Sequence, residues 1–214
     1  MAYRNGELIS TRTLHDPPRL RRNPRRRFPP EVLTPIEVAA MLDACSSRPT
    51  GIRNRAMLVT LYRAGLRINE ALSLRPKDLS IEQGSIRVLN GKGGKARTVG
   101  MDPAAFEYMT HWLVHRIERG LPDSAPLFCM LDGRPLSTSY VRLLFHRLGR
   151  AAGIAKRVHP HGLRHTHAAE LRAEGIDIGI ISKQLGHTSI ATTARYLDHI
   201  APVAIIQAIA KRLW

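Results

Sequence analysis

The chain of 214 residues has little of what stabilises secreted or membrane proteins. Its two cysteines, Cys45 and Cys129, are too few for a disulfide framework and fit a reducing compartment. No apolar run approaches the ~18 residues that a membrane-spanning helix needs. The first thirty residues also lack the apolar stretch of a secretory signal. These absences argue against a membrane or secreted protein and predict a cytoplasmic one.

Acidic residues are scarce as well. Only 17 Asp and Glu stand against 33 Lys and Arg, which leaves a formal net charge of +16. A charge of this size bears on binding partners, and the usual partner is a polyanion, above all nucleic acid. Because 43% of the residues are hydrophobic, the chain can still bury a proper core. The composition therefore predicts a folded protein that binds double-stranded DNA.

The excess of basic residues is densest near the start of the chain, where residues 1–30 hold eight arginines and two acids. Proline and repeated like charge disfavour a helix there, so we expect an extended arm over residues 1–33. Two interpretations stay open, an arm laid along DNA phosphates and a solvated tail. The arm arginines that would contact phosphates are Arg19, Arg21, Arg22, Arg25, Arg26 and Arg27.

Residues 34–214 show the pattern of one mainly helical α+β domain. The expected helices span residues 34–45, 52–64, 68–74, 103–119, 137–152, 163–174, 178–185 and 202–213. Between residues 79 and 101 the period changes to that of strands. This change predicts a small three-stranded antiparallel sheet, with a glycine-rich turn at residues 91–95 between its last two strands.

Side chains suited to phosphodiester chemistry occur beside the predicted helix ends and in the glycine-rich turn. In chain order they are Arg67, Glu70, Lys92, Lys95, His161, Arg164, His187 and Tyr196. A tyrosine hydroxyl can attack phosphorus, while guanidinium and imidazole donors stabilise the charge that develops on the phosphoryl oxygens. Taken singly, each residue has an ordinary structural explanation, such as a solvated face or a satisfied helix end. Their order and spacing carry the functional interpretation.

The histidines also raise the question of a metal site. Six of them lie between residues 159 and 199: His159, His161, His165, His167, His187 and His199. Neither a cysteine nor a glutamate at the spacing of a zinc protease accompanies them. We therefore predict no metal and no cofactor, and we expect His165 to serve in packing or in support of the site.

The four motifs together resemble the tyrosine recombinase (phage integrase) family. The resemblance runs from about Leu33 to His199. It rests on the segments Gly65–Glu70, Gly91–Lys95, His161–Thr166 and Leu185–His187, the last followed by Tyr196. It implies the catalytic-domain fold of that family. It also implies site-specific recombination or integration, as in mobile elements, through a 3′-phosphotyrosine intermediate and without metal or ATP.

The resemblance implies a role for each residue that would surround the scissile phosphate. Arg67 and Arg164 would hold its non-bridging oxygens, and His187 would add a hydrogen bond. Glu70 matches an acid that supports the site in this family without attacking anything.

The remaining roles concern bond making and proton transfer. Tyr196 would be the nucleophile, and His161 would help with its proton. Lys92, in preference to Lys95, would protonate the leaving 5′ oxygen. A free tyrosine has a pKa near ~10, so it needs neighbouring cations or a base to attack at neutral pH.

Most members of the family carry a separate helical core-binding domain ahead of the catalytic domain. The roughly 33 residues before the resemblance are too few for it, so a helper protein that supplies this binding is one expectation. The last predicted helix has an apolar stripe, formed by Val203, Ile205, Ile206, Ile209 and Leu213. The stripe either packs on its own domain or, as the resemblance implies, docks on a neighbouring subunit in a tetramer on DNA.

Two other functions stay open beside the recombinase. A DNA-binding accessory protein that no longer cuts is one, although all six expected catalytic positions are intact. A type IB topoisomerase, which relaxes supercoils at single sites, is the other, although the short distance from residues 185–187 to Tyr196 favours a recombinase. The target sequence, and the choice between integration, excision and resolution, do not follow from the sequence.

Overall fold

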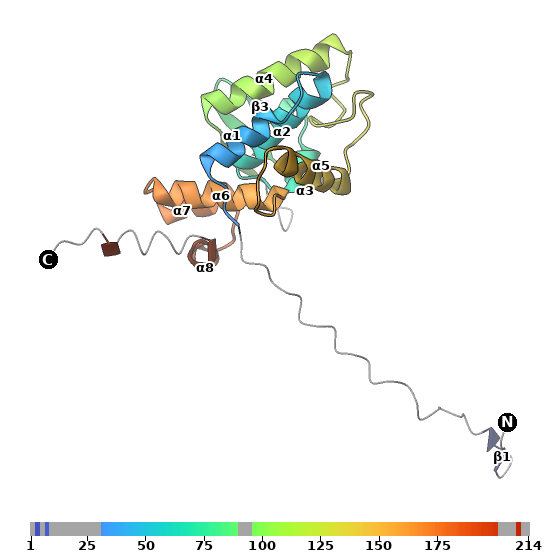
Figure 1. The fold of residues 1–214 in the computed structure, drawn as a ribbon, viewed down its shortest axis with the longest axis vertical. Helices are drawn as coiled ribbons and strands as arrows, with labels where there is room; N and C mark the ends of the chain where they lie inside the picture. The colour runs from blue at the N-terminus through green and yellow to red at the C-terminus, as the bar shows by residue number, and fades with distance from the viewer. Residues whose placement is uncertain (1–2, 5–6, 9–30, 90–95, 201–208, 211–214) are drawn as a thin grey trace.

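A computed structural model of the chain describes residues 3–4, 7–8, 31–89, 96–200 and 209–210. The α-helices within these ranges are α1 (Pro35–Asp43), α2 (Pro49–Arg63), α3 (Ile68–Ser73), α4 (Pro103–Glu118), α5 (Thr138–Ala151), α6 (Pro160–Ala173), α7 (Ile178–Leu185) and α8 (Ile190–Ile200). The strands are β1 (Tyr3–Arg4), β2 (Glu7–Leu8), β3 (Leu79–Ser80), β4 (Ser85–Val88) and β5 (Arg97–Gly100), and a 3-10 turn η1 spans Pro76–Asp78. The predicted mainly helical α+β fold is confirmed (Figure 1).

The three-stranded sheet has the predicted order and direction. β4 lies between β3 and β5, and both pairings are antiparallel. Ile86 of β4 pairs with Val99 of β5, and both side chains are buried. Thr98, the residue before Val99 on β5, is exposed. This alternation is that of a sheet with one face on the core. A separate pair, β1 with β2, joins residues 3–4 to residues 7–8.

Local capping explains where several helices begin and end. The Thr34 hydroxyl accepts from the Glu37 amide at 3.2 Å, and the Glu37 carboxylate accepts from the Thr34 amide at 2.7 Å. With Pro35 at the first helical position, this capping box starts α1 as the sequence predicts. α2 is followed by Gly65 at φ +62°, and Gly186 follows α7 at φ +64°. Left-handed backbone of this kind favours glycine and ends a helix.

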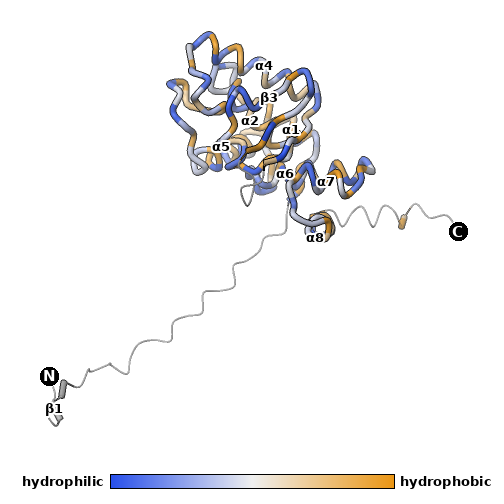
Figure 2. The backbone as a smooth tube through the Cα atoms, turned by 180° about the vertical axis from the view of Figure 1, so that it is seen from behind, coloured by the Kyte–Doolittle hydropathy of each residue, from blue (hydrophilic) through white to orange (hydrophobic). Residues whose placement is uncertain are grey.

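Helix α2 lies at the centre of the main core, between α4 on one side and α6 on the other (Figure 1). Met57, Leu58 and Leu61 of α2 are fully buried there with Trp112 of α4 and Phe145 of α5. Polar and apolar stretches alternate along the chain of this body (Figure 2). Such alternation is expected when each helix turns one apolar face inward.

A second, smaller apolar cluster joins the last three helices at the end of the body away from α4 (Figure 1). It consists of Ala168 from α6, Ile181 and Leu185 from α7, and Leu197 and Ile200 from α8. α6 belongs to both clusters, because Leu163, one turn before Ala168, packs in the main core. The helix therefore connects the two parts of the domain, and its first turns carry His161 and Arg164.

The structure differs from the sequence prediction in three helices. α2 begins at Pro49 rather than at residue 52. α6 begins at Pro160 rather than at residue 163, because His159 caps it by accepting from the Gly162 amide at 3.1 Å. α8 was not predicted at all. The predicted helix at 202–213 lies outside the described residues except for residues 209–210, which are helical. Within the described part of the chain, no helix is long and apolar enough to cross a membrane.

Candidate active site

Arg67 and Glu70 form the first element of the site, at the start of α3. Glu70 is 3% exposed, and its carboxylate accepts from the Arg67 backbone amide at 2.9 Å and from the Arg67 guanidinium at 2.7 Å. The other side of the guanidinium donates to the Gly186 carbonyl at 3.4 Å. Arg67 is thus tied to its own helix and to the end of α7, which brings two of the sequence motifs together.

Glu70 is ionised despite its burial. Burial by itself raises the pKa of a carboxyl group, but hydrogen bonds from Arg97 and Arg67 outweigh it and hold the pKa of Glu70 at about 2. Arg97 supplies two of these bonds, each 2.9 Å long, from its two terminal nitrogens to the two carboxylate oxygens. One buried anion therefore balances two guanidinium groups.

Arg164 is a buried cation on α6 with 1% of its surface exposed. Its guanidinium donates to the carbonyl oxygens of Gly65 and Leu185 and lies 3.4 Å from Nε2 of His187. Among the described residues no carboxylate forms an ion pair with it. Burial and the neighbouring charge of Arg67 lower the pKa of Arg164 to about 10, so it remains protonated at neutral pH.

His187 follows the Gly186 turn and lies against Arg164. Its Nδ1 is 2.9 Å from the hydroxyl of Thr193, the buried first-turn residue of α8. Burial, with the charges of Arg164 and Arg67, lowers the pKa of His187 to about 4. The imidazole is therefore neutral at pH 7, with one N–H donor and one acceptor nitrogen.

Tyr196 projects from α8 into the same cluster. Its ring stands edge-on to the His187 ring at 5.2 Å and stacks on the His165 ring at 5.2 Å. The hydroxyl is buried and has no hydrogen-bond partner among the described residues. Burial raises the pKa of Tyr196 to about 12, while the nearby charge of Arg164 works in the opposite direction.

His161 lies at the solvent edge of the cluster, where its ring meets the His165 ring edge-on at 4.4 Å. The ring of His165, which the sequence analysis assigned to packing or support, thus contacts both the His161 ring and the Tyr196 ring. Partial withdrawal from water, followed by the charge of Arg164, lowers the pKa of His161 to about 4. Burial lowers the pKa of His165 further, to about 3, and its Nδ1 has no partner among the described residues.

The arrangement can be compared with known proteins at this point. The sequence profile described as the phage integrase family matches residues 31–201, well over half of the chain. The chain belongs to the phage integrase family. The family and the catalytic-domain fold that the motifs predicted are both confirmed.

Named relatives and solved structures agree with this assignment. Tyrosine recombinase XerC of Proteus mirabilis is 33% identical over 181 residues, covering 83% of this chain and 59% of the relative. The crystal structure of XerA recombinase superposes with a TM-score of 0.76 at 29% identity, covering 89% of this chain and 66% of that one. XerH site-specific recombinase, in a post-cleavage complex with its palindromic difH substrate, gives a TM-score of 0.70 at 28% identity, covering 84% and 52%. The chain therefore spans between 52% and 66% of the length of these three proteins.

Some residues predicted for the phage integrase site lie outside the described residues. Lys92 and Lys95 fall in the undescribed segment 90–95, and the six arm arginines, Arg19, Arg21, Arg22, Arg25, Arg26 and Arg27, fall in 9–30. In the described part of the chain no group of three or more His, Cys, Asp or Glu residues could hold a metal ion.

Arg97 contacts Glu70 in this site, and the sequence analysis did not predict that contact. The sequence placed it in a strand, and its side chain turns out to be 13% exposed and paired with Glu70. Gln184, also missed, bridges α7 and β5: its side chain accepts from the Gly100 amide at 3.0 Å and donates to the Gly100 carbonyl at 2.8 Å. The only hint for Arg97 was its position two residues beyond Lys95, on the strand that leaves the lysine turn.

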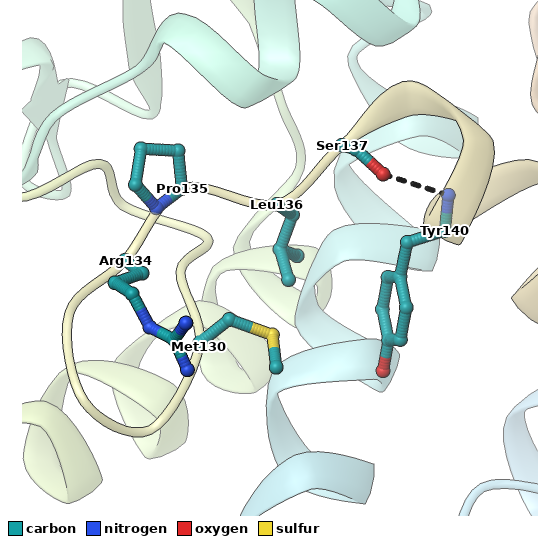
Figure 3. A pocket seen from close by; sticks show the side chains of 6 residues that line it. All are labelled: Met130, Arg134, Pro135, Leu136, Ser137 and Tyr140. Carbon is teal, nitrogen blue, oxygen red and sulfur yellow. Dashed lines mark hydrogen bonds between the residues drawn. The ribbon is translucent and has the colours of Figure 1, made fainter.

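A hollow of about 450 Å³ lies in another part of the domain and shares no residue with the cluster (Figure 3). Met130, Arg134, Pro135, Leu136, Ser137 and Tyr140 line it. The Ser137 hydroxyl caps α5 by accepting from the Tyr140 amide at 3.1 Å. Arg134 is already paired with Asp132 at 2.7 Å, and the Tyr140 hydroxyl accepts from Arg53 at 2.8 Å. These polar groups have partners within the fold, unlike the Tyr196 hydroxyl and Nδ1 of His165.

Proposed function

We propose that the chain cuts and rejoins double-stranded DNA in site-specific recombination, with Tyr196 as the nucleophile and a 3′-phosphotyrosine as the intermediate. One observation carries this proposal: the buried Tyr196 hydroxyl lies in a cluster with more positive than negative charge. Arg67, Arg97 and Arg164 are near one carboxylate, that of Glu70. Uncompensated buried cations are costly. A phosphodiester, which is an anion and gains charge as it is attacked, would satisfy them.

In the proposed reaction the Tyr196 oxygen forms a bond to phosphorus, and the bond from phosphorus to the 5′ oxygen breaks. The phenol proton passes to a neutral imidazole, for which His161 is our candidate. Arg67, Arg164 and the N–H of His187 stabilise the charge on the non-bridging oxygens. Reversal by a 5′ hydroxyl restores the DNA and the tyrosine. The bond energy is kept in the phosphotyrosine, so rejoining needs no ATP, and the arginines supply the positive charge that a metal would otherwise provide.

The leaving 5′ oxygen needs a proton. We propose Lys92 as its donor, with Lys95 as the alternative in the same turn. The resemblance of Gly91–Lys95 to the family's lysine turn supports this choice, as does the position of β5, which leads from that turn to Arg97 and the cluster.

Binding and assembly extend the proposal. The arm, residues 1–33, contacts DNA phosphates through its six clustered arginines, and residues 34–214 form the catalytic domain. The exposed apolar residues Ile180 of α7 and Ile190 of α8, with the apolar stripe of residues 203–213, support docking between subunits in a tetramer on DNA. A helper protein that supplies core binding is a further proposed partner.

The test uses a nicked suicide duplex built from the DNA that flanks the gene, without metal, and a denaturing gel that retains covalent adducts. Wild-type protein is expected to form the adduct, and Tyr196→Phe is expected to form none. Tyr108→Phe on α4 is the matched control, because it removes a phenol hydroxyl outside the cluster, and it should form the adduct at the wild-type rate.

A second arm of the experiment identifies the proton donor. A bridging sulfur in place of the 5′ oxygen leaves without a proton, so it should restore cleavage only to the variant that lacks the general acid. Rescue of Lys92→Ala supports our assignment, and rescue of Lys95→Ala alone overturns it.

The remaining outcomes distinguish the other functions. DNA binding without any adduct, on any flanking duplex or on supercoiled plasmid, would indicate a non-cutting accessory protein. Metal-free relaxation of supercoiled plasmid, with no strand exchange between two sites, would indicate activity of the type IB topoisomerase kind.

A further inference from the structure

Arg97, the first residue of β5, contacts both segments that hold the phosphate-binding side chains. We propose that Arg97 is a positioning residue: by occupying Glu70 it leaves Arg67 available to the scissile phosphate, and by supporting the end of α7 it sets the position of His187. This inference rests on the proposed function, which assigns those two residues to the phosphate.

The contact with Glu70 is a two-point one. The two terminal nitrogens of Arg97 donate to the two carboxylate oxygens, each at 2.9 Å. Parallel bonds of this kind are stronger and more directional than a single bond between the same charges. Glu70 also accepts two bonds from Arg67, so four donors meet one carboxylate that has about four acceptor positions. The carboxylate is saturated.

Saturation determines how strongly Glu70 holds Arg67. Without Arg97, the buried carboxylate would have only Arg67 left to compensate it, at 2.7 Å. Because Glu70 is only 3% exposed, water would screen its remaining ion pair with Arg67 only weakly. Arg67 would then be held by Glu70 in competition with the DNA phosphate. Arg97 removes that competition, because it shares the negative charge of Glu70 and lets Arg67 keep a net attraction for an anion.

The second contact is with the end of α7. Nε of Arg97 donates to the Gln184 carbonyl at 3.3 Å. Gly186 packs so closely on the guanidinium that a Cβ at this position would lie 2.8 Å from Cζ of Arg97. His187 is the next residue in the chain. The guanidinium therefore forms the surface on which the left-handed turn before His187 rests, and a change in its shape would move the imidazole.

Arg97 itself is poorly placed to bind the phosphate. Each of its three nitrogens already donates to an acceptor in the protein, and its side chain is 13% exposed, against 27% for Arg67. Its effect on the reaction must then pass through Glu70 and the α7 end, which makes the proposal testable by coupling between substitutions.

The experiment compares Arg97→Lys and Arg97→Gln with wild type in two measurements, the affinity for the suicide duplex and the single-turnover rate of adduct formation at saturating DNA. Arg87→Gln is the matched control, because Arg87 on β4 carries the same charge with 56% of its side chain exposed, outside these contacts. We expect Arg97→Gln to lower the rate about 100-fold, the effect of a small misplacement of catalytic groups. Its DNA affinity should stay within about 3-fold of that of the control.

Arg97→Lys is expected to remain slow, because an ammonium keeps the charge but cannot make two parallel bonds to a carboxylate. A wild-type rate for Arg97→Lys would show that charge alone is needed and would overturn the positioning role. A thermal melt of each variant shows whether it folds. If Arg97→Gln does not fold, Arg97→Lys alone is compared with wild type.

Coupling gives the sharpest test. If Arg97 acts through Glu70, then Arg97→Gln should have little further effect in a Glu70→Gln background, and the double variant should match Glu70→Gln within about 3-fold. Multiplication of the two separate losses would instead mean that Arg97 acts independently of Glu70, and would overturn its role in releasing Arg67 from Glu70.

A readout that needs no cleavage separates this inference from the proposed function. In the DNA-free protein, the side-chain ¹⁵N signals of His187 should shift in both Arg97 variants, while those of His115, paired with Glu118 on α4, should not. Unchanged His187 signals would overturn the inference, whether or not wild-type protein forms an adduct. A shifted His187 with no adduct from wild-type protein would leave Arg97 as the support of this turn and reject only the recombinase chemistry.

Discussion

At the scale of the single residue, the charge state of the cluster follows from what each group meets when it leaves water. Glu70 meets guanidinium donors and has a pKa of about 2. His167 is buried near the charges of Arg63 and Arg164, and burial, the largest effect, lowers its pKa to about 4. The pKa is lowered in both groups. For Glu70 this means that the fold stabilises the ionised form, whereas for His167 it means that the fold disfavours the protonated form.

These shifts determine how stability depends on pH. The folded-state pKa of Glu70 lies below its ordinary value of 4.5, so its stabilising effect is complete above pH 4.5 and is lost as the pH falls toward 2. The lowered histidine pKa values act at higher pH. Unfolding lets those histidines take up protons, so stability falls as the pH drops from about 6.5 to about 4.

The contribution of Glu70 can be isolated with Glu70→Gln. Between pH 5 and pH 3 the free energy of unfolding of wild-type protein should fall by about 2 kcal/mol more than that of the variant, as the pKa shift implies. Urea unfolding at both pH values measures this difference. The histidines titrate in both proteins and cancel.

Glu107→Gln is the control for this comparison, because it neutralises an exposed carboxylate on α4. It should follow the wild-type curve. Equal losses of stability for Glu70→Gln and wild type would contradict the lowered pKa of Glu70.

At the scale of the element, the turn after α7 has two separate reasons to contain glycine. Gly186 has φ +64°, which L-residues rarely adopt, and the space that a Cβ would fill is taken by Arg97. Gly175, which follows α6, has φ +79° but nothing within 4 Å of its Cβ position. Both glycines have the left-handed backbone that favours glycine. Only Gly186 also has a neighbouring side chain at its Cβ position.

This pair gives a prediction about the element. Gly175→Ala should cost about 1 kcal/mol of unfolding free energy, from backbone strain alone, and leave adduct formation unchanged. Gly186→Ala should cost more than this and slow adduct formation, because the added methyl group displaces Arg97 and the turn before His187. Thermal or urea unfolding and the adduct assay measure the two effects. Equal behaviour of the two variants would mean that the contact between Gly186 and Arg97 has no catalytic consequence.

Helix α8 shows why an element can escape a sequence analysis. The adjacent threonines Thr192 and Thr193 in its first turn lower helix propensity. The usable signal was local: the Ser189 hydroxyl accepts from the Thr192 amide at 3.2 Å, and Thr193, Leu197 and Ile200 are buried at helical spacing. Packing on α6 and α7 then stabilises a helix that its own composition favours only weakly.

At the scale of the whole molecule, the net charge of +16 sets the salt dependence of DNA binding. Each phosphate contact adds about 0.9 to the slope of log affinity against log salt concentration. We expect replacement of the six clustered arm arginines, residues 19–27, by glutamine in the full chain to reduce this slope by up to about 5. Fluorescence anisotropy with a labelled duplex at several salt concentrations measures it.

Arg119→Gln, an exposed substitution just beyond the end of α4, is the control and should change the slope by less than about 1. An unchanged slope after all six replacements would show that the arm is a solvated tail, the other interpretation of its sequence.

The sequence by itself determined the features that depend on neighbouring residues. The capping box at Thr34, the glycine that follows α2 and the alternation in β4 and β5 all act over a few residues, so each could be predicted locally. The order of the motifs was also sufficient to predict the family.

Only the tertiary structure decided which of these groups share charge. Arg97 reaches Glu70 across 27 residues and Gln184 across 87, and neither separation has a periodicity that a sequence reveals. His165 likewise contacts both His161 and Tyr196 because α8 packs against α6. The physical reason is that a buried charge needs a nearby partner, and the packing of the helices decides which groups lie within reach. These contacts therefore depend on the whole fold and not on neighbouring residues in the sequence.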